Sequence, residues 1–127
     1  MDGKQVVRDF IDAVWRQGRL EELDHWWTEG CINHAAPDGA RKGLDALAAY
    51  HRAFAEQMAG FAHADIQVVQ QVAEGDRVVT QLRTSARHVA SGRDVHLDTM
   101  RLDRIEDGRI AEHWSVADLA GLATQLA

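Results

Sequence analysis

The chain has a single cysteine and a single proline, and only 6% of its 127 residues are aromatic. With Cys31 alone, an internal disulfide and any CxxC metal or redox pair are excluded. No apolar run approaches the roughly 18 residues needed to span a bilayer, which argues against a membrane partner. The net charge of −6 argues against nucleic acid as a partner, because phosphate binding depends on clustered Lys and Arg. Since the N-terminus also lacks the apolar core of a secretory signal, we expect a cytoplasmic protein.

What is present is the composition of an ordinary globular domain, 46% hydrophobic and 27% charged. The length of 127 residues and the lack of repeats or linker-like stretches predict one domain, 1–127. Seven histidines could suggest a metal site. However, the sequence has no HxH or HExxH spacing, so we predict that no metal is bound.

The first half of the chain has the apolar spacing of helices. Apolar residues repeat at four-residue intervals over 6–14, and Gly18 ends this pattern. The sequence then predicts a short helix at 20–27, a brief strand at 31–34 and a third helix at 47–58.

From His63 onward the apolar period changes from near four to two, which is typical of strands. Gly-containing turns separate the strands, and a short amphipathic helix at 119–126 follows the last one. A single switch from helices to strands predicts an α+β fold in which the N-terminal helices pack in a curved antiparallel sheet. Such a cone encloses a pocket at its open end. The four predicted strands are 66–72, 78–85, 95–105 and 110–116.

Four stretches of the sequence resemble the SnoaL-like polyketide cyclases of the NTF2-like superfamily. The longest is RIEDGRIAEHWSVADLAGLATQL at 104–126, which has that family's D-G turn, H-W pair and following Asp. The others are FIDAVWRQGRLEEL at 10–23, the pair Asn33-His34, and AEGDRVV at 73–79. The resemblance implies the cone-shaped NTF2-like fold and a small-molecule ligand.

The resemblance also implies a chemistry, because these cyclases close a polyketide ring by an intramolecular aldol reaction without metal or organic cofactor. The Asp after the H-W pair is the acid/base in that family, and it corresponds to Asp118. We therefore expect a cofactor-free acid/base enzyme, a lyase or isomerase, acting on a small apolar oxygenated substrate. The alternatives are another NTF2-like isomerase or hydrolase, or a non-catalytic dimeric binding module, since one scaffold hosts many functions.

Asp118 also has a purely structural interpretation. Ser115-Val116-Ala117-Asp118 has the spacing of a capping box, with Ser115 as the N-cap and an acid three residues later. A carboxylate there is favoured by the helix dipole. The sequence leaves both roles open.

Other candidates come from residues that the predicted fold places near a pocket. His34 precedes the Pro37 loop, and its imidazole is suited to orienting a carbonyl or carrying a proton, so we assign it a catalytic role. The alternative is a histidine that only anchors the loop. The predicted ligand-binding residues are Trp114, Asn33, His96, Asp98 and Tyr50.

Trp114 is interpreted as core or as a pocket wall. Because successive side chains of a strand point to opposite faces, His113 would then face the outer surface of the sheet. His96 and Asp98 belong to the strand at 95–105, where the alternative is a set of surface ion pairs.

The strands carry apolar residues on both faces, for example Val78 and Leu82 on one face and Val79 on the other. Apolar positions on both faces need cover on both sides. We therefore expect a homodimer that forms through the outer face of the sheet.

Overall fold

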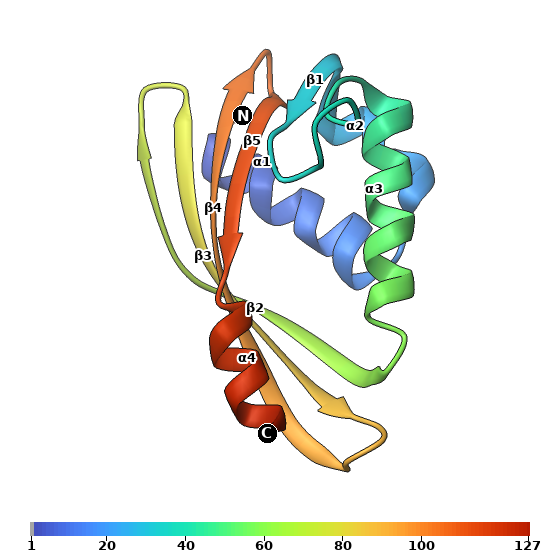
Figure 1. The fold of residues 1–127 in the computed structure, drawn as a ribbon. Coiled ribbons are helices and arrows are strands. Elements are labelled where there is room, and N and C mark those ends of the chain that lie inside the picture. Colours follow the sequence, from blue (N-terminus) through green and yellow to red (C-terminus); the bar gives the residue numbers. More distant parts are fainter. Residues whose placement is uncertain (1) are drawn as a thin grey trace.

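The computed structural model describes residues 2–127 and confirms an α+β fold with a curved, open sheet (Figure 1). The strands lie in the order β1-β5-β4-β3-β2, and the N-terminal helices cover the concave face. None of the helices within residues 2–127 is long and apolar enough to cross a membrane. The elements are α1 (Gly3–Phe10), a π-helical turn (Ile11–Arg16), a 3-10 turn (Leu20–Glu22), α2 (Leu23–Trp26), β1 (Trp27–Asn33), α3 (Leu44–Gln57), β2 (Phe61–Glu74), β3 (Arg77–His88), β4 (Arg93–Glu106), β5 (Arg109–Ala117) and α4 (Leu119–Leu126).

The first helix and its π-helical extension supply the centre of the core. Val6, Val7, Phe10 and Ile11 are completely buried between the sheet and the other helices. Asp2 caps α1 by accepting a hydrogen bond from the amide of Lys4, and the helical segment stops before Gly18, as predicted. The predicted four-residue spacing therefore corresponds to the buried face of this segment.

The strands β2 to β5 form the predicted antiparallel meander. The turn between β4 and β5 has Asp107 and Gly108 at φ 50° and 76°, the left-handed backbone that a two-residue hairpin turn requires. One prediction needs correction, because the sheet is not entirely antiparallel. β1 lies beside β5 and runs parallel to it. The short strand joins the edge of the sheet only after the chain has passed through the N-terminal helices.

A β-bulge near the start of β5 decides which side chains face the helices. Ile105 pairs with Ile110, but Arg104 pairs with Glu112, so β5 contains one extra residue. Ile110 is fully buried, whereas Glu112 and every second residue after it point to the outer face. The bulge therefore reverses the alternation along β5, which is why His113 and not Trp114 faces the helices.

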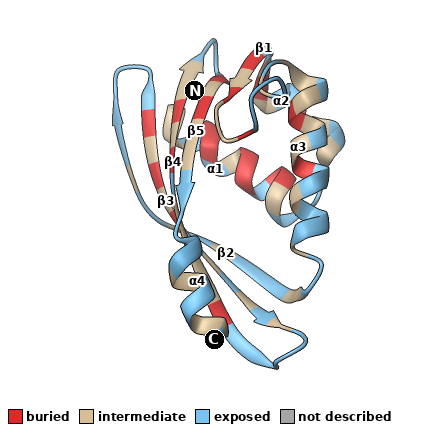
Figure 2. Ribbon diagram, in the orientation of Figure 1, coloured by how far each residue is buried: buried red, intermediate tan, exposed pale blue. Residues whose placement is uncertain are grey.

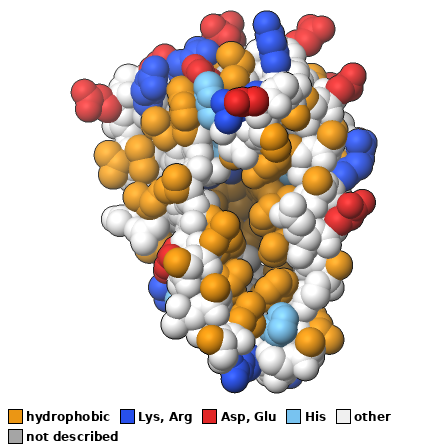
Figure 3. Space-filling model, in the orientation of Figure 1, with side chains coloured by type: hydrophobic (Ala, Val, Ile, Leu, Met, Phe, Trp, Pro, Cys, Tyr) orange, Lys and Arg blue, Asp and Glu red, His pale blue; other side chains and the backbone are white. Residues whose placement is uncertain are grey.

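The helices cover only part of the concave face. Buried residues concentrate where α1, β1 and the adjacent ends of the strands meet, whereas the far ends of β2, β3 and β4 are mostly exposed or intermediate, apart from the buried Val95 (Figure 2). Because α3 packs mainly on β1 and α2, the middle of the sheet is not covered by this helix. The surface is hollowed between α3 and β5, and hydrophobic side chains surround the opening (Figure 3).

The last helix, α4, covers the edge of β4 that extends beyond β5. The Gln125 side chain accepts a hydrogen bond from the backbone amide of His96 and donates one to the backbone carbonyl of His96. These two hydrogen bonds take the place of those that a neighbouring strand would form with β4. Asp118 itself caps this helix, and its Oδ1 accepts a hydrogen bond from the amide of Gly121 at 2.9 Å. The predicted N-cap was Ser115, which instead lies within β5 because the strand continues to Ala117.

Candidate active site

Three charged or polar side chains meet on the concave face, and none of them is among the site residues predicted from the sequence. Asp103 is fully buried, and its two oxygens accept hydrogen bonds from Nε and Nη2 of Arg101 at 2.7 and 3.0 Å. Nδ1 of His113 lies 2.8 Å from Oδ1 of the same carboxylate. These residues are neighbours because Asp103 and His113 pair across β4 and β5, and Arg101 is two residues along the same face of β4.

The surroundings fix the protonation state of this Arg101–Asp103–His113 cluster. Burial alone would raise the pKa of Asp103, but Arg101 and His113 outweigh it and lower this pKa from 3.8 to about 2. Burial and the charge of Arg101 lower the pKa of His113, although Asp103 acts in the opposite direction. Near neutral pH the cluster therefore consists of a carboxylate, a guanidinium and a neutral imidazole.

The second nitrogen of His113 is free to act on a ligand. Since the ionised Asp103 can only accept, Nδ1 of His113 donates to it and Nε2 keeps its lone pair. Nε2 has no hydrogen-bond partner among residues 2–127 and is still accessible, because the enclosed unpaired atoms of this region belong to Trp26, Trp27 and Gln71. A base oriented by a buried carboxylate is the arrangement that general-base catalysis uses.

Two residues of α3 line the opposite side of this region. Burial raises the pKa of the Tyr50 hydroxyl, although the charge of Arg101 lowers it, so the hydroxyl is a donor at neutral pH. His51 is buried against Trp15, with ring centroids 4.6 Å apart. Burial, Arg101 and His113 lower the pKa of His51 from 6.5 to about 4. Tyr50, a predicted ligand-binding residue, is thus close enough to the cluster to be influenced by its charge.

Asn33 is the other predicted site residue that lies beside the cluster. It is buried at the end of β1 and pairs with His113 in the parallel register of β1 and β5. Its side-chain oxygen accepts a hydrogen bond from the amide of Ala35, which fixes the orientation of the amide group. Asn33 therefore holds the chain at the edge of the site.

His34 and Trp114 lie on the outer face of the sheet, away from the cluster. Their rings stack at 4.8 Å with an interplanar angle of 7°. Nε2 of His34 lies 2.7 Å from Glu112, whose other oxygen accepts a hydrogen bond from Arg104. The orientation expected from the sequence is therefore reversed, since Trp114 faces outward and His113 faces the helices. The catalytic and ligand-binding roles predicted for these residues remain predictions.

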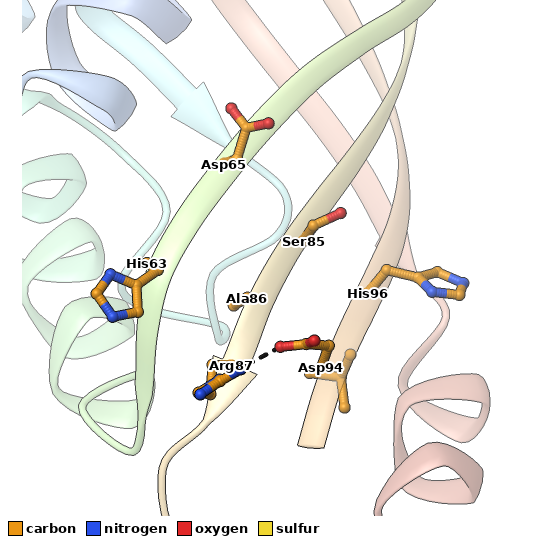
Figure 4. Close-up of a pocket in the computed structure, with 8 residues that line it drawn as sticks. His63, Asp65, Ser85, Ala86, Arg87, Asp94 and His96 are labelled. Atoms are coloured by element: carbon orange, nitrogen blue, oxygen red, sulfur yellow. Dashed lines mark hydrogen bonds and ion pairs between the residues drawn. The ribbon is translucent and has the colours of Figure 1, made fainter. Parts of the chain in front are cut away.

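His96 and Asp98 are also on the outer face, toward the far end of β4. Asp98 forms a bidentate ion pair with Arg83 at 2.8 and 3.1 Å, which corresponds to the surface-pair alternative. His96 borders a shallow pocket of about 600 Å³ at this end of the sheet (Figure 4). His63 and His96 point away from each other there, and Arg87 is paired with Asp94 at 3.3 Å.

Asp118 is exposed at the start of α4 and has the capping role that the sequence left open. Its amide also donates to the carbonyl of Asp98, which extends the pairing of β4 and β5 by one residue. A catalytic role for Asp118 remains a prediction.

The sequence interpretation missed the residues that make up the cluster. Asp103 and Arg101 were not considered, and His113 was assigned to the outer face. The signal that could have found them is the alternation of Arg101 and Asp103 with apolar Met100 and Leu102, which places both charged residues on one face of the strand. Within residues 2–127 the structure has no group of three or more His, Cys, Asp or Glu side chains suited to a metal ion.

Together the fold and the cluster define an α+β cone that has a buried acid/base pair on its concave face and an apolar hollow between α3 and β5. Residues 5–126 match the family model of the SnoaL-like polyketide cyclases, so the chain belongs to this family. Among proteins with curated functions, no sequence matches this chain.

Solved structures of similar proteins have the same fold. TsrD from Streptomyces laurentii is 27% identical, with a TM-score of 0.79 over 98% of this chain and 93% of its own. IdmH from Streptomyces antibioticus, proposed to be a polyketide cyclase, is 21% identical, with a TM-score of 0.84 over 99% of both chains. AclR from Streptomyces galilaeus, proposed to be a hydroxylase, is 19% identical, with a TM-score of 0.75 over 98% of this chain and 83% of its own. The last two likenesses concern the fold alone.

Proposed function

We propose that this protein is a cofactor-free acid/base enzyme that acts on a small, apolar, oxygenated substrate of polyketide type and closes a ring by an intramolecular aldol reaction. The observation that carries the proposal is the hydrogen bond between the buried Asp103 and His113, whose second nitrogen is free. The hollow between α3 and β5, the strand that carries His113, has hydrophobic side chains around its opening and suits a mostly apolar ligand with few polar groups (Figure 3).

In the proposed reaction, Nε2 of His113 removes a proton from a carbon alpha to a ketone. The C–H electron pair becomes the C=C bond of an enolate, and the carbonyl π pair moves to oxygen. The enolate carbon attacks a second carbonyl carbon of the same molecule, which forms the new C–C bond. The resulting alkoxide then takes the proton back from His113. No external oxidant, reductant or co-reactant is needed.

Asp103 and Arg101 make this proton transfer possible without reacting themselves. The carboxylate fixes the tautomer of His113 and stabilises the imidazolium that forms. Arg101 compensates the negative charge of Asp103. Without this guanidinium, burial would favour the protonated form of the Asp103 carboxyl group. Because water is largely excluded around Asp103, these interactions are stronger than on the surface.

An isomerase on the same site is the second candidate. Both reactions begin with the same proton removal, and His113 is equally placed to return the proton to another carbon of the substrate. The two candidates differ in the product, which contains a new C–C bond only in the aldol reaction. A hydrolase or a non-catalytic binding module would not use the free nitrogen of His113 for proton removal from carbon.

The experiment is hydrogen–deuterium exchange of the alpha protons of 2-tetralone and related bicyclic ketones in D₂O, followed by NMR. We expect the wild type to accelerate exchange, and His113→Gln and Asp103→Asn to reduce the acceleration by roughly 10²- to 10⁴-fold. Asp76→Asn, which changes an exposed carboxylate in the turn between β2 and β3, is the matched control and should exchange like the wild type. Circular dichroism verifies that each variant is folded. Exchange no faster than in buffer for every ketone contradicts the proposal.

We also propose that two copies pair through the outer face of the sheet and that the protein works in the cytoplasm. The outer face of the sheet carries an apolar patch, which we call the outer apolar patch and which consists of Val72, Val79, Met100, Leu102, Trp114 and Val116. This patch supports the first proposal, because Val72 and Val116 are 65% and 73% exposed. The free thiol of the buried Cys31 supports the second.

A further inference from the structure

His51 is a buried polar side chain without a hydrogen-bond partner in the described part of the chain. It is 5% exposed, and neither of its ring nitrogens makes a hydrogen bond within residues 2–127. The nitrogens are nevertheless accessible, because they are not among the enclosed unpaired atoms. Most buried polar groups are paired. A buried but accessible imidazole that is left unpaired therefore indicates a place for a ligand atom.

Aromatic neighbours hold the His51 ring in place. The Trp15 and His51 centroids are 4.6 Å apart, Phe10 meets the ring edge-on at 5.9 Å, and Tyr50 at 6.0 Å. Phe10 also contacts Arg101, whose guanidinium carbon lies 5.2 Å from the ring centroid. His51 on α3 and the Arg101–Asp103–His113 cluster on the sheet are thus on two sides of one site.

We infer that His51 is a catalytic residue that donates a hydrogen bond to the substrate's ketone oxygen and keeps this bond as the oxygen becomes an enolate. This inference rests on the proposed function and identifies the substrate class more closely. The substrate has a carbonyl or enol oxygen on a flat apolar ring, and the ring packs beside the aromatic wall of His51 and Trp15. His113 receives the proton from carbon, while His51 and the charge of Arg101 stabilise the oxygen.

The protonation state of His51 suits this role. Its pKa of about 4 keeps the ring neutral, with one N–H donor and one lone pair, throughout the physiological range. A neutral imidazole stabilises an enolate by hydrogen bonding but transfers its proton to the oxygen less readily than an imidazolium would. The enolate carbon therefore remains nucleophilic, as the formation of a C–C bond requires.

The test compares the binding of 2-naphthol, a planar mimic of the enol of 2-tetralone, with that of 2-methylnaphthalene, in which a methyl group replaces the hydroxyl. Dissociation constants are measured by equilibrium dialysis. We expect the wild type to prefer 2-naphthol by about tenfold, as for one hydrogen bond in a buried site. His51→Phe should reduce the preference to less than about twofold without weakening 2-methylnaphthalene binding. His51→Gln, which retains an N–H donor, should restore part of it.

The matched control is His25→Phe, because the His25 side chain is 64% exposed and lies on α2 rather than on α3. This variant should keep the wild-type preference. Equal affinities of the two probes in the wild type, or an unchanged preference in His51→Phe, would overturn the inference. Binding is measured separately from exchange, so a normal preference without any exchange of 2-tetralone rejects the proposed function and not the hydrogen bond to His51. In the exchange assay itself, His51→Phe should lower kcat by roughly 10²-fold and change KM little.

Discussion

Nδ1 of His113 lies 2.8 Å from Oδ1 of Asp103, and no part of Asp103 is exposed to solvent. A carboxylate in this position is costly to desolvate unless its charge is compensated. Arg101 provides the compensation through two hydrogen bonds, and the bulge in β5 places His113 in line with them. The stability of the sheet and the orientation of the candidate base therefore depend on the same contacts.

Asp103→Asn is expected to be strongly destabilising. The amide has the shape of the carboxylate but no charge, so Arg101 is left buried without a counterion. Removal of one partner of a buried pair costs about 3–5 kcal/mol. Asp98→Asn removes a carboxylate from the exposed pair with Arg83 and should cost far less, because exposed ion pairs contribute little to stability. Urea unfolding of both variants gives the comparison, and equal losses would show that Arg101 finds another partner.

The stability of the protein should fall as the pH decreases from about 6.5 to 4. The pKa of His51 is about 4 in the folded state against 6.5 for the unfolded chain, so the unfolded state binds more protons in this window. Protonation therefore favours unfolding, and the contribution of His51 is about 3 kcal/mol when the pH has reached 4. The lowered pKa of His113 acts in the same direction. Asp103 has a pKa of about 2 against 3.8 in the unfolded chain, so it causes a further loss of stability only as the pH falls below about 4 toward 2.

Urea unfolding at several pH values tests this origin of the pH dependence. His51→Phe should have a smaller slope of unfolding free energy against pH than the wild type between pH 4 and 6.5. The control is Leu47→Ala on the same helix, where the loss of a buried apolar side chain lowers stability by about 2–5 kcal/mol at every pH. Parallel curves for the wild type and His51→Phe would mean that His51 is not the titrating group.

Asp118 should stabilise α4 as its cap. We expect Asp118→Ala to cost about 1 kcal/mol, as for other lost N-caps, and Asp118→Asn to cost much less because Asn is also a good cap. Ser115→Ala should not have the cost of a lost cap, because Ser115 lies within β5. The same variants in the exchange assay examine the catalytic role predicted for Asp118. If Asp118→Asn is stable but abolishes exchange, Asp118 and not His113 is the base.

The proposed homodimer should dissociate when charge is placed on the outer apolar patch. Met100 and Val116 pair across β4 and β5 there and are 46% and 73% exposed. Val116→Glu should weaken the dimer because two like charges would be buried in the interface. Light scattering at micromolar concentrations measures the mass. A wild type that is monomeric at those concentrations would reject the dimer, and Val69→Glu, an exposed position outside the patch, is the control for nonspecific effects of charge.

The sequence by itself determined the order and type of most elements. The change of apolar period near His63 predicted the helices before the sheet, and Gly18 and the Gly-containing turns marked ends and turns that the structure contains, the turns at Gly75 and Gly108 among them. These features are local, because helical periodicity, alternation and left-handed glycines depend on nearby residues. The family resemblance over 104–126 agrees with the family model, which matches residues 5–126.

Only the tertiary structure decided which residues form the candidate site. Alternation along β4 and β5 separates the residues of one face from those of the other, but it does not show which face is the inner one. The more apolar face is normally taken to be the inner face. Here the interior group contains Arg101, Asp103 and His113, and the outer group contains Leu102 and Trp114. A buried polar cluster violates the usual pattern, as functional sites often do.

The bulge after Ile110 is a second reason why the sequence alone did not determine which residues form the candidate site. A one-residue shift in register moves every later side chain of a strand to the other face, and no local pattern in the sequence marks its position. The pairing of Asp103 with His113, and the approach of His51 from α3, depend on contacts between segments distant in sequence. Turns and helices are fixed by neighbours along the chain, whereas this site exists only where the curved sheet and α3 face each other.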